Sequence, residues 1–377
     1  MSGRDFSSLK VVVIKLGTSI MTGPDGLFSK AVLRRLIQQI LQMARKKRLR
    51  VVIVSSGAIG LGMEVLGLKR RPRELAALQA CAAVGQGKLM HIYEESFAKQ
   101  GYHTAQILLT RDEFAEHKLY LNARRTLSEL LNRGIIPIIN ENDTVATYEI
   151  QFGDNDTLAA LVGQLIRAEL TILLSDVEGF FLKDGSRVDC ITSESEVEGL
   201  KSHLYTRKRE HTVGGMTTKL NAAKILLHSG LSLLIADGRD GKILDKIITG
   251  QNVGTLFLGS GQTMNSQKSW LAHSARVQGT VTVDAGAEDA ILKKGKSLLA
   301  RGVTAISGAF KKGDVVRIAS LTGSVIGLGK INYTSDEMTK IIGKTTAEIP
   351  QILGYKHKDE VVHHNHWVSL CIPSEKV

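Results

Sequence analysis

The sequence has few cysteines and no long apolar run. Its three cysteines, Cys81, Cys190 and Cys371, show no CxxC spacing, which argues against a disulfide framework and against a cysteine zinc site. No apolar stretch approaches the roughly 20 residues that a membrane helix requires, and the first apolar run, residues 11–14, is too short for an export signal. We therefore expect a soluble, cytoplasmic protein without a membrane partner, with Cys81 in its core.

Acidic residues are too few to balance the basic ones. The 377 residues include 49 Lys and Arg against 37 Asp and Glu, a formal net charge of +12. From residue 277 onward, 13 basic and 10 acidic residues leave only +3, so most of the excess lies before that point. Such a charge indicates an anionic partner, either the phosphates of a nucleotide or a nucleic acid. Charge alone does not choose between these.

Short apolar runs alternate with helical stretches up to about residue 261. The runs are continuous, which is typical of buried strands; they are residues 11–14, 51–54, 107–109, 135–139, 170–174 and 231–235. Helical patterns lie between them, at residues 31–47, 74–100, 119–132 and 157–168. This order predicts an α/β protein, a three-layer α/β/α sandwich with a mostly parallel central sheet. Gly85, inside one helical stretch, indicates either close packing or a break in the helix.

The last third of the chain differs in character. After a polar stretch at residues 259–274, long helical periodicity is scarce and short β-type segments bounded by glycine take over, at residues 280–283, 303–308, 315–318 and 324–328. These predict a small, mostly-β module. We set the domain limits at 9–262 and 277–370.

Two clusters rich in Asn and Asp stand close together in the sequence. Asn140-Glu141-Asn142-Asp143 closes an apolar run, and Asp154-Asn155-Asp156 opens a helical pattern. Such side chains at the carboxyl end of a buried strand lie where open α/β sheets bind ligands. Amides both donate and accept hydrogen bonds, so together they suit a ligand with an ammonium and a carboxylate, such as an amino acid. Alternatively, these residues only turn the chain, with Asp154 or Asn155 as a helix N-cap.

Small residues follow two of the predicted strands. In Lys15-Leu16-Gly17-Thr18-Ser19, Gly17 lets the backbone come close while Lys15 projects from the strand end, which suits a phosphate. Taken alone, a lysine after a strand is more often a solvated strand end. In Ser55-Ser56-Gly57-Ala58, hydroxyls and free N–H groups at a helix start can hold a carboxylate or phosphate oxygen. We interpret Ser56 as a binding group, because no histidine and acid pair forms a serine-hydrolase arrangement with it.

Two later segments suit a nucleotide. Ser175-Asp176 follows a buried strand and can hold a base or ribose, although a bare turn explains it equally well. Residues 213–219, Val213-Gly214-Gly215-Met216-Thr217-Thr218-Lys219, precede a helical pattern that we expect to begin at Leu220. A glycine pair, two hydroxyls and a lysine would then meet at a helix N-terminus, which favours an anion.

In this order the segments resemble the glutamate 5-kinases of the amino acid kinase family, over nearly the whole chain. Relatives that phosphorylate acetylglutamate, aspartate, carbamate or UMP share the lysine and glycine turns, whereas the INENDTVA and GDND pair is typical of the glutamate enzymes. The tail from Gly279 resembles the PUA domain. The matching blocks are Lys15–Ser19, Ser56–Ala58, Ala83–Gln86, Leu108–Thr110, Asn122–Arg124, Ile139–Asp143, Phe152–Asp156, Gly214–Met216 and Thr218-Lys219.

The resemblance implies transfer of the γ-phosphoryl group of ATP to the side-chain carboxylate of L-glutamate. The products are L-glutamyl 5-phosphate and ADP, in the first step of proline biosynthesis. It implies catalytic roles for Lys15, Lys219 and Asp156, with the lysines stabilising the transferring phosphoryl, Asp156 orienting them, and no general base. Mg²⁺ would bridge the phosphates, and we assign no protein ligand to it.

The resemblance also implies binding residues. Ser56, Asp143 and Asn155 would bind glutamate, with Asp143 on the ammonium. ATP would lie against Lys15, Ser175, Asp176, Val213, Gly214, Gly215, Met216, Thr217, Thr218 and Lys219. Feedback inhibition by proline and a homo-oligomer, dimer or tetramer, are implied as well. Thr212-Val213 replaces the usual Gly-Thr, which we expect to alter ATP affinity, and Ser175 replaces the commoner threonine while keeping its hydroxyl.

Two alternatives stay open. The first is an RNA-binding protein acting through the PUA domain, which the tail's +3 charge and few aromatics disfavour; these are Phe310, Tyr333, Tyr355 and Trp367. The second is a related kinase acting on acetylglutamate or aspartate, and an ammonium-binding Asp143 disfavours an N-acetylated substrate.

Overall fold

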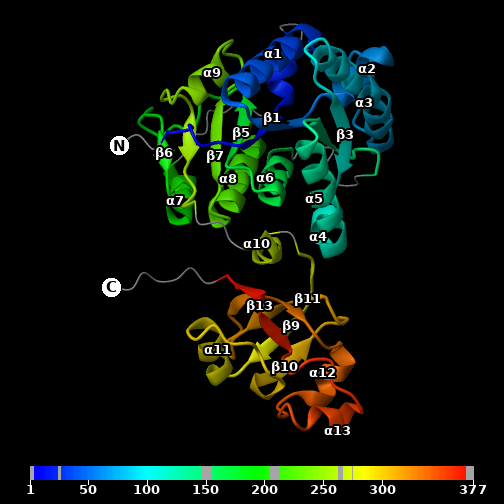
Figure 1. Ribbon diagram of the computed structural model, residues 1–377, viewed down its shortest axis with the longest axis vertical. Helices are drawn as coiled ribbons and strands as arrows, with labels where there is room; N and C mark the ends of the chain where they lie inside the picture. Colours follow the sequence, from blue (N-terminus) through cyan, green and yellow to red (C-terminus); the bar gives the residue numbers. More distant parts are fainter. Residues whose placement is uncertain are drawn as a thin grey trace. The chain divides into compact units, whose positions relative to one another are not determined.

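The computed structural model describes residues 4–23, 27–145, 155–203, 212–261, 266–273 and 275–370 (Figure 1). The chain divides into two compact units, one of residues 1–113 and 118–263 and a smaller one of residues 114–117 and 264–377. The domain limits drawn from the sequence, 9–262 and 277–370, stay predictions. No helix in the described ranges is long and apolar enough to cross a membrane.

The first unit is built on an eight-stranded sheet with the order β3-β4-β2-β1-β5-β7-β8-β6. Paired strands run parallel, except that β8 is antiparallel to β7. All six predicted runs overlap these strands, so the α/β fold is confirmed. The strands are β1 (Val11–Leu16), β2 (Arg50–Ser55), β3 (Thr104–Leu109), β4 (Ile136–Glu141), β5 (Leu170–Ser175), β6 (Cys190–Ile191), β7 (Ser232–Asp237) and β8 (Thr255–Phe257).

Helices cover both faces of this sheet, which gives the predicted three layers. In Figure 1, α1 and α9 lie on one side of the strands and α5, α6 and α8 on the other. The helices are α1 (Lys30–Lys47), α2 (Ala58–Val65), α3 (Leu75–Ala98), α4 (Arg111–Ala115), α5 (His117–Asn132), α6 (Asn155–Ile166), α7 (Glu194–His203), α8 (Thr212–His228) and α9 (Ile243–Ile248), with a short 3₁₀ helix η1 (Thr18–Met21).

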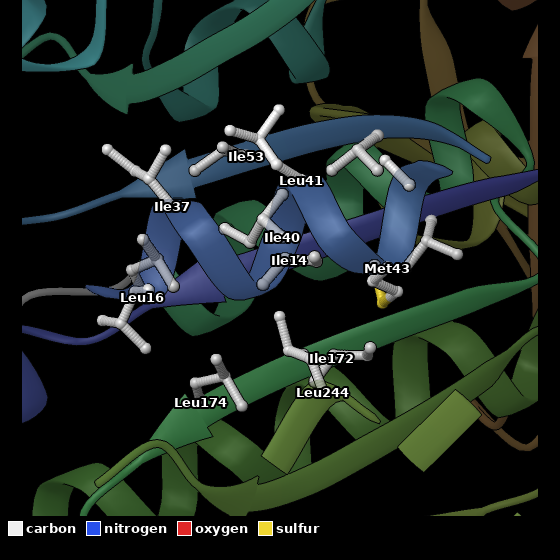
Figure 2. Packing of buried hydrophobic residues seen from close by; sticks show 14 of the residues in the cluster. Ile14, Leu16, Ile37, Ile40, Leu41, Met43, Ile53, Ile172, Leu174 and Leu244 are labelled. Carbon is white, nitrogen blue, oxygen red and sulfur yellow. The ribbon is translucent and has the colours of Figure 1, made fainter. Parts of the chain in front are cut away.

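Helix α1 has clear start and stop signals and one apolar face. The Ser29 hydroxyl caps its start by accepting from the Val32 N–H at 3.3 Å. At its end, the C-cap residue Arg48 has a left-handed conformation. Basic residues 45–47 complement the negative end of the helix dipole. Its apolar face packs on the sheet, where Figure 2 shows Ile37, Ile40 and Met43 near Ile14 and Leu16 of β1 and Ile172 and Leu174 of β5.

Alternation along β1 sends its lysine to the opposite face. Ile14 and Leu16 belong to the core cluster that contains α1. Since successive side chains of a strand point to opposite faces, Lys15 between them points to the face on which α6 contacts β1. The strand geometry therefore determines which helices the lysine can meet.

Strand β1 is the point at which the order of the sheet reverses. The chain places β2, β4 and β3 on one side of β1 and then crosses over to place β5 on the other. In open α/β sheets, ligands bind outside the carboxyl ends of the strands at such a switch point. β1 ends at Leu16, which pairs with Leu174 of β5, so Gly17 and Asp176 lie just beyond it.

Helices α2 and α3 pack with their backbones in close contact. A Cβ added to Gly62 would lie 1.8 Å from the carbonyl oxygen of Cys81, and one added to Gly85 would lie 1.8 Å from that of Ala58. Because α3 runs unbroken from Leu75 to Ala98, Gly85 serves close packing and a helix break is excluded. Cys81 is buried, as predicted.

One predicted strand is less buried than expected. Residues 107–109 were interpreted as a buried strand, but Ile107 and Leu108 are only half-buried. Their strand, β3, lies at the edge of the sheet and pairs only with β4. An apolar run predicts a strand without saying whether that strand has a neighbour on each side.

The second unit is mostly β, as predicted. Its sheet has the order β10-β9-β11-β12-β13, antiparallel except where β9 pairs with β11. The sequence did not predict β13, whose His-rich stretch lacks a continuous apolar run. The elements are α10 (Ser266–His273), β9 (Val277–Val283), α11 (Ala285–Leu292), η2 (Ala300–Gly302), β10 (Val303–Ser307), β11 (Val315–Ala319), β12 (Val325–Ile331), α12 (Ser335–Ile341), α13 (Ile349–Leu353) and β13 (Val362–Ser369).

Candidate active site

One buried carboxylate near the carboxyl end of β1 binds two lysines. Oδ1 of Asp156 lies 2.6 Å from Nζ of Lys15, and Oδ2 lies 3.0 Å from Nζ of Lys219. Less than a tenth of each side chain is exposed. The Thr218 hydroxyl also donates to Oδ2, at 3.0 Å. We call Lys15, Asp156 and Lys219 the charged centre; these are the three residues predicted to be catalytic.

Three elements bring the charged centre together. Lys15 points to the α6 face of β1, and Asp156 is the second residue of α6. Helix α6 also packs against α8, which carries Lys219. The carbonyl oxygen of Gly215, one turn earlier in α8, accepts from Nζ of Lys219 at 3.3 Å. It also lies 3.0 Å from the Thr218 hydroxyl oxygen, whose one hydrogen it would share with Asp156.

The pKa values of the charged centre reflect its burial and its excess of positive charge. Burial alone would raise the pKa of Asp156, but the two neighbouring ammonium groups outweigh it and hold that pKa far below the usual range. The pKa of Lys219 is lowered, first by burial and also by Lys15, although Asp156 opposes the shift. With both lysines protonated, the charged centre carries one uncompensated positive charge.

The segment predicted to bind nucleotide lies inside α8 rather than before it. We expected the helix to begin at Leu220, but it begins at Thr212, so Lys219 is in the helix interior. The predicted anion site at a helix N-terminus that includes Lys219 is therefore wrong. Val213, Gly214, Gly215, Met216, Thr217 and Thr218 occupy the first two turns, and a glycine pair, usually a helix breaker, concealed this start.

The loops after β1 and β5 are tied together. Oδ1 of the exposed Asp176 accepts from the hydroxyls of Ser175 at 3.1 Å and Ser19 at 3.2 Å. The N–H of Gly17 donates to the Leu174 carbonyl at 3.2 Å, and a Cβ on Gly17 would lie 3.3 Å from Nζ of Lys15. Burial lowers the pKa of Lys219, and Asp176 is close enough to oppose that shift in part. The predicted nucleotide residues Ser175 and Asp176 therefore adjoin the charged centre.

A group of neutral polar side chains adjoins the charged centre. Its central member is Asn155, the residue directly before Asp156. Nδ2 of Asn155 donates to the Ser56 hydroxyl at 2.8 Å, to the Ser55 carbonyl at 3.0 Å and to Oδ1 of Asn140 at 3.3 Å. Nδ2 of Asn140 donates to Oε1 of Gln86 at 2.9 Å. We call Ser56, Gln86, Asn140 and Asn155 the amide cluster. It joins two predicted glutamate-binding residues, Ser56 and Asn155.

Within the described residues, no hydrogen bond joins Asp143, the third predicted glutamate ligand, to the amide cluster. It follows β4 and is half-buried. Burial raises its pKa to about 6, although Arg71 acts in the opposite direction. Asp154, the first residue of the second cluster rich in Asn and Asp, lies outside the described residues, as do residues 146–153.

Sequence reasoning missed several residues of the site. Thr218 was assigned to the nucleotide, yet its hydroxyl binds Asp156. The sequence assigns no role to Gln86, and none to Tyr93, whose hydroxyl lies 2.8 Å from that of Ser55. A glutamine inside the apolar stretch of α3 was the available signal for Gln86. Nothing in the sequence gave a comparable signal for Tyr93.

The sequence matches the amino acid kinase family over residues 10–237 and the PUA domain over residues 279–353. It is 43% identical to a glutamate 5-kinase from Caldanaerobacter subterraneus subsp. tengcongensis over 363 residues, which cover 95% of this chain and 97% of that protein. It is 42% identical to the glutamate 5-kinases of Moorella thermoacetica and Geobacter sulfurreducens, with 97% of this chain and 97% and 98% of those proteins covered. These matches extend over both units.

Proposed function

Because this chain belongs to the amino acid kinase family, and within it to the glutamate 5-kinases, we propose that the charged centre is where it transfers the phosphoryl group. The chain is an ATP-dependent phosphotransferase with L-glutamate as acceptor, which places it in proline biosynthesis. One observation carries the assignment of the centre: two lysines from distant parts of the sequence bind the two oxygens of one buried carboxylate.

The chemistry needs alignment and positive charge more than proton removal. The acceptor is a carboxylate, which is already a nucleophile at neutral pH, so no general base is required. The excess positive charge of Lys15 and Lys219 would stabilise the negative charge of the transferring phosphoryl. In this proposal Asp156 positions the two ammonium groups. Its low pKa and its two ion pairs make it a poor proton acceptor.

We assign the nucleotide to the side of the centre formed by the β1 and β5 loops and the start of α8. Ser175, Asp176 and residues 213–219 would bind ATP. In support of this, Asp176 accepts from Ser175 and from Ser19 in the β1 loop, and a Cβ on Gly17 in that loop would lie 3.3 Å from Nζ of Lys15. Asp156 is already paired with two lysines, so Mg²⁺ would be held mainly by phosphate oxygens, as is common for this ion. When bound, it supplies additional positive charge to the phosphates.

We assign glutamate to the amide cluster and Asp143. Ser56 and Asn155 are joined by a hydrogen bond, and Asn155 directly precedes Asp156. A substrate held there would lie beside the charged centre. Asp143 carries a charge opposite to that of the substrate ammonium, which supports its assignment to that group.

A coupled assay of ADP release tests the substrate. We expect turnover with L-glutamate and little with acetylglutamate, aspartate or UMP, run in parallel at equal concentrations. Faster turnover with acetylglutamate or aspartate would overturn the glutamate assignment. Feedback inhibition by proline and assembly into dimers or tetramers stay predictions; titrating proline at fixed glutamate, and sedimentation of the full chain, test them.

A further inference from the structure

The amide cluster contains a buried donor and a buried acceptor that no described residue satisfies. Nε2 of Gln86 and Oδ1 of Asn155 both lack a hydrogen-bond partner within the described part of the chain, and the two residues are only 8% and 7% exposed. Leaving a buried polar atom unpaired costs about 1–3 kcal/mol. Two such atoms in one cluster therefore require an explanation.

Backbone groups determine which end of each amide is left over. Oδ1 of Asn140 accepts from the Glu141 N–H at 2.9 Å, so its NH₂ group must face Gln86, and Gln86 must present its oxygen in return. The NH₂ group of Asn155 donates to the Ser55 carbonyl at 3.0 Å. Since a backbone N–H only donates and a backbone carbonyl only accepts, the remaining atoms are a donor on Gln86 and an acceptor on Asn155.

The two unpaired atoms belong to side chains that share one hydrogen-bond partner, but only one of these side chains is next to the charged centre in the sequence. Both amides hydrogen-bond to the same side chain, that of Asn140. Asn155 is adjacent in sequence to Asp156, whereas Gln86 is the last amide of the series. A ligand with a negative group and a positive group on neighbouring atoms would satisfy both, with its negative group further from Asp156.

We propose that Gln86 is a specificity-determining residue whose Nε2 donates to the α-carboxylate of the substrate, while Oδ1 of Asn155 accepts from its ammonium. The assignment rests on the proposed function. The α-carboxylate and the ammonium of an amino acid are attached to the same carbon atom, so they lie close together. Gln86 and Asn155 are likewise held close together, because both hydrogen-bond to Asn140. The side-chain carboxylate is then free to extend toward the charged centre.

Replacing the donor of Gln86 by an anionic oxygen tests this directly. Gln86→Glu keeps the length of the side chain and the oxygen that accepts from Asn140. We expect the KM for glutamate to rise about tenfold or more, because a hydrogen bond to a charged group is replaced by repulsion, with the KM for ATP nearly unchanged. Gln100→Glu, the same change at an exposed position beyond α3, is the control and should leave both constants unchanged.

A substrate analogue separates recognition from mere support of the fold. Glutamate α-amide carries a carboxamide in place of the α-carboxylate, so its NH₂ group can donate to the introduced carboxylate. We expect the ratio of kcat/KM for glutamate to that for the α-amide to fall by about a hundredfold from the wild type to Gln86→Glu. A structural role would lower both values together and leave the ratio unchanged, which would overturn the proposal.

The outcomes distinguish this proposal from the proposed function. A wild-type chain that does not phosphorylate glutamate would refute the function itself. Wild-type activity with an unchanged ratio would refute only the role of Gln86 and would leave an ordered water as the partner of both atoms. If Gln86→Glu fails to fold, Gln86→Met removes the donor without adding charge, and we then expect the ratio to fall about tenfold.

Discussion

The charged centre and the amide cluster are both buried and adjacent, yet they differ in what they leave unsatisfied. In the charged centre, one carboxylate serves two ammonium groups and a positive charge remains. The amide cluster is neutral, and among the described residues one buried donor and one buried acceptor of the cluster have no partner. Buried charge is costly unless it is paired, so the first region favours an anion such as phosphate. The second region favours a group with both signs, such as the head of an amino acid.

Removing the carboxylate of the charged centre should have the largest effect. Asp156→Asn leaves two buried ammonium groups without a counter-ion, which should lower the free energy of unfolding by about 3–5 kcal/mol, measured by urea denaturation. Glu129→Gln is the matched control, because Glu129 forms an exposed ion pair with Arg133 and should have little effect. Equal stability of Asp156→Asn and the wild type would mean that the lysines are not charged in the free protein.

Removing one lysine should impair turnover more than folding. Lys219→Ala leaves Asp156 paired with Lys15 but removes a positive charge from the transferring phosphoryl. We expect kcat to fall by roughly 10²–10³-fold, measured by ADP release, while the circular dichroism spectrum stays native. Lys224→Ala, on the same helix and paired with Glu198, should keep normal turnover. Normal turnover in Lys219→Ala would exclude that lysine from catalysis.

The amide cluster should depend on the packing of α2 and α3. Gly85→Ala places a Cβ against the Ala58 carbonyl and should destabilise the protein by about 1–3 kcal/mol. Because Gln86 directly follows Gly85, the KM for glutamate should rise more than the KM for ATP. Gly87→Ala, where the added Cβ would point into open space away from its own helix backbone, should instead stabilise by about 0.5–1 kcal/mol. Thermal melts of the pair test this contrast.

The smallest effect should be a pH dependence of glutamate binding. Burial raises the pKa of Asp143 to about 6, so below pH 6 the folded protein holds a proton there and loses the charge that attracts ammonium. We expect kcat/KM for glutamate to fall about tenfold per pH unit below 6 in the limit of a single titration, with the KM for ATP nearly constant. Asp143→Asn should abolish this pH dependence. If it persists in the variant, another group is responsible.

Much of the fold could be read from apolar periodicity because buried parallel strands are continuous apolar runs. The runs that became β1, β2, β4 and β5 were predicted close to their observed bounds. The predicted start of α8 was wrong because the low helix propensity of Gly214-Gly215 indicates a break in the helix. The burial of β3 was predicted wrongly because a strand's neighbours are a property of the sheet. Strand β13 was missed because three histidines and an asparagine separate its buried residues, Val362, Trp367 and Val368.

The sequence by itself determined which residue types were available to the site: lysine at the end of the first strand, Asx residues after the fourth, and hydroxyls beside glycine. Those choices are local, because strand ends and helix starts depend on short-range patterns. Only the tertiary structure decided that Lys15 and Lys219 meet on one carboxylate, and that Gln86 and Asn155 keep a donor and an acceptor that no described residue pairs. The first outcome depends on the contacts of α6 with β1 and α8, and the second on the contacts of α6 with β2 and β4. These contacts join segments too distant along the chain for any local pattern to relate.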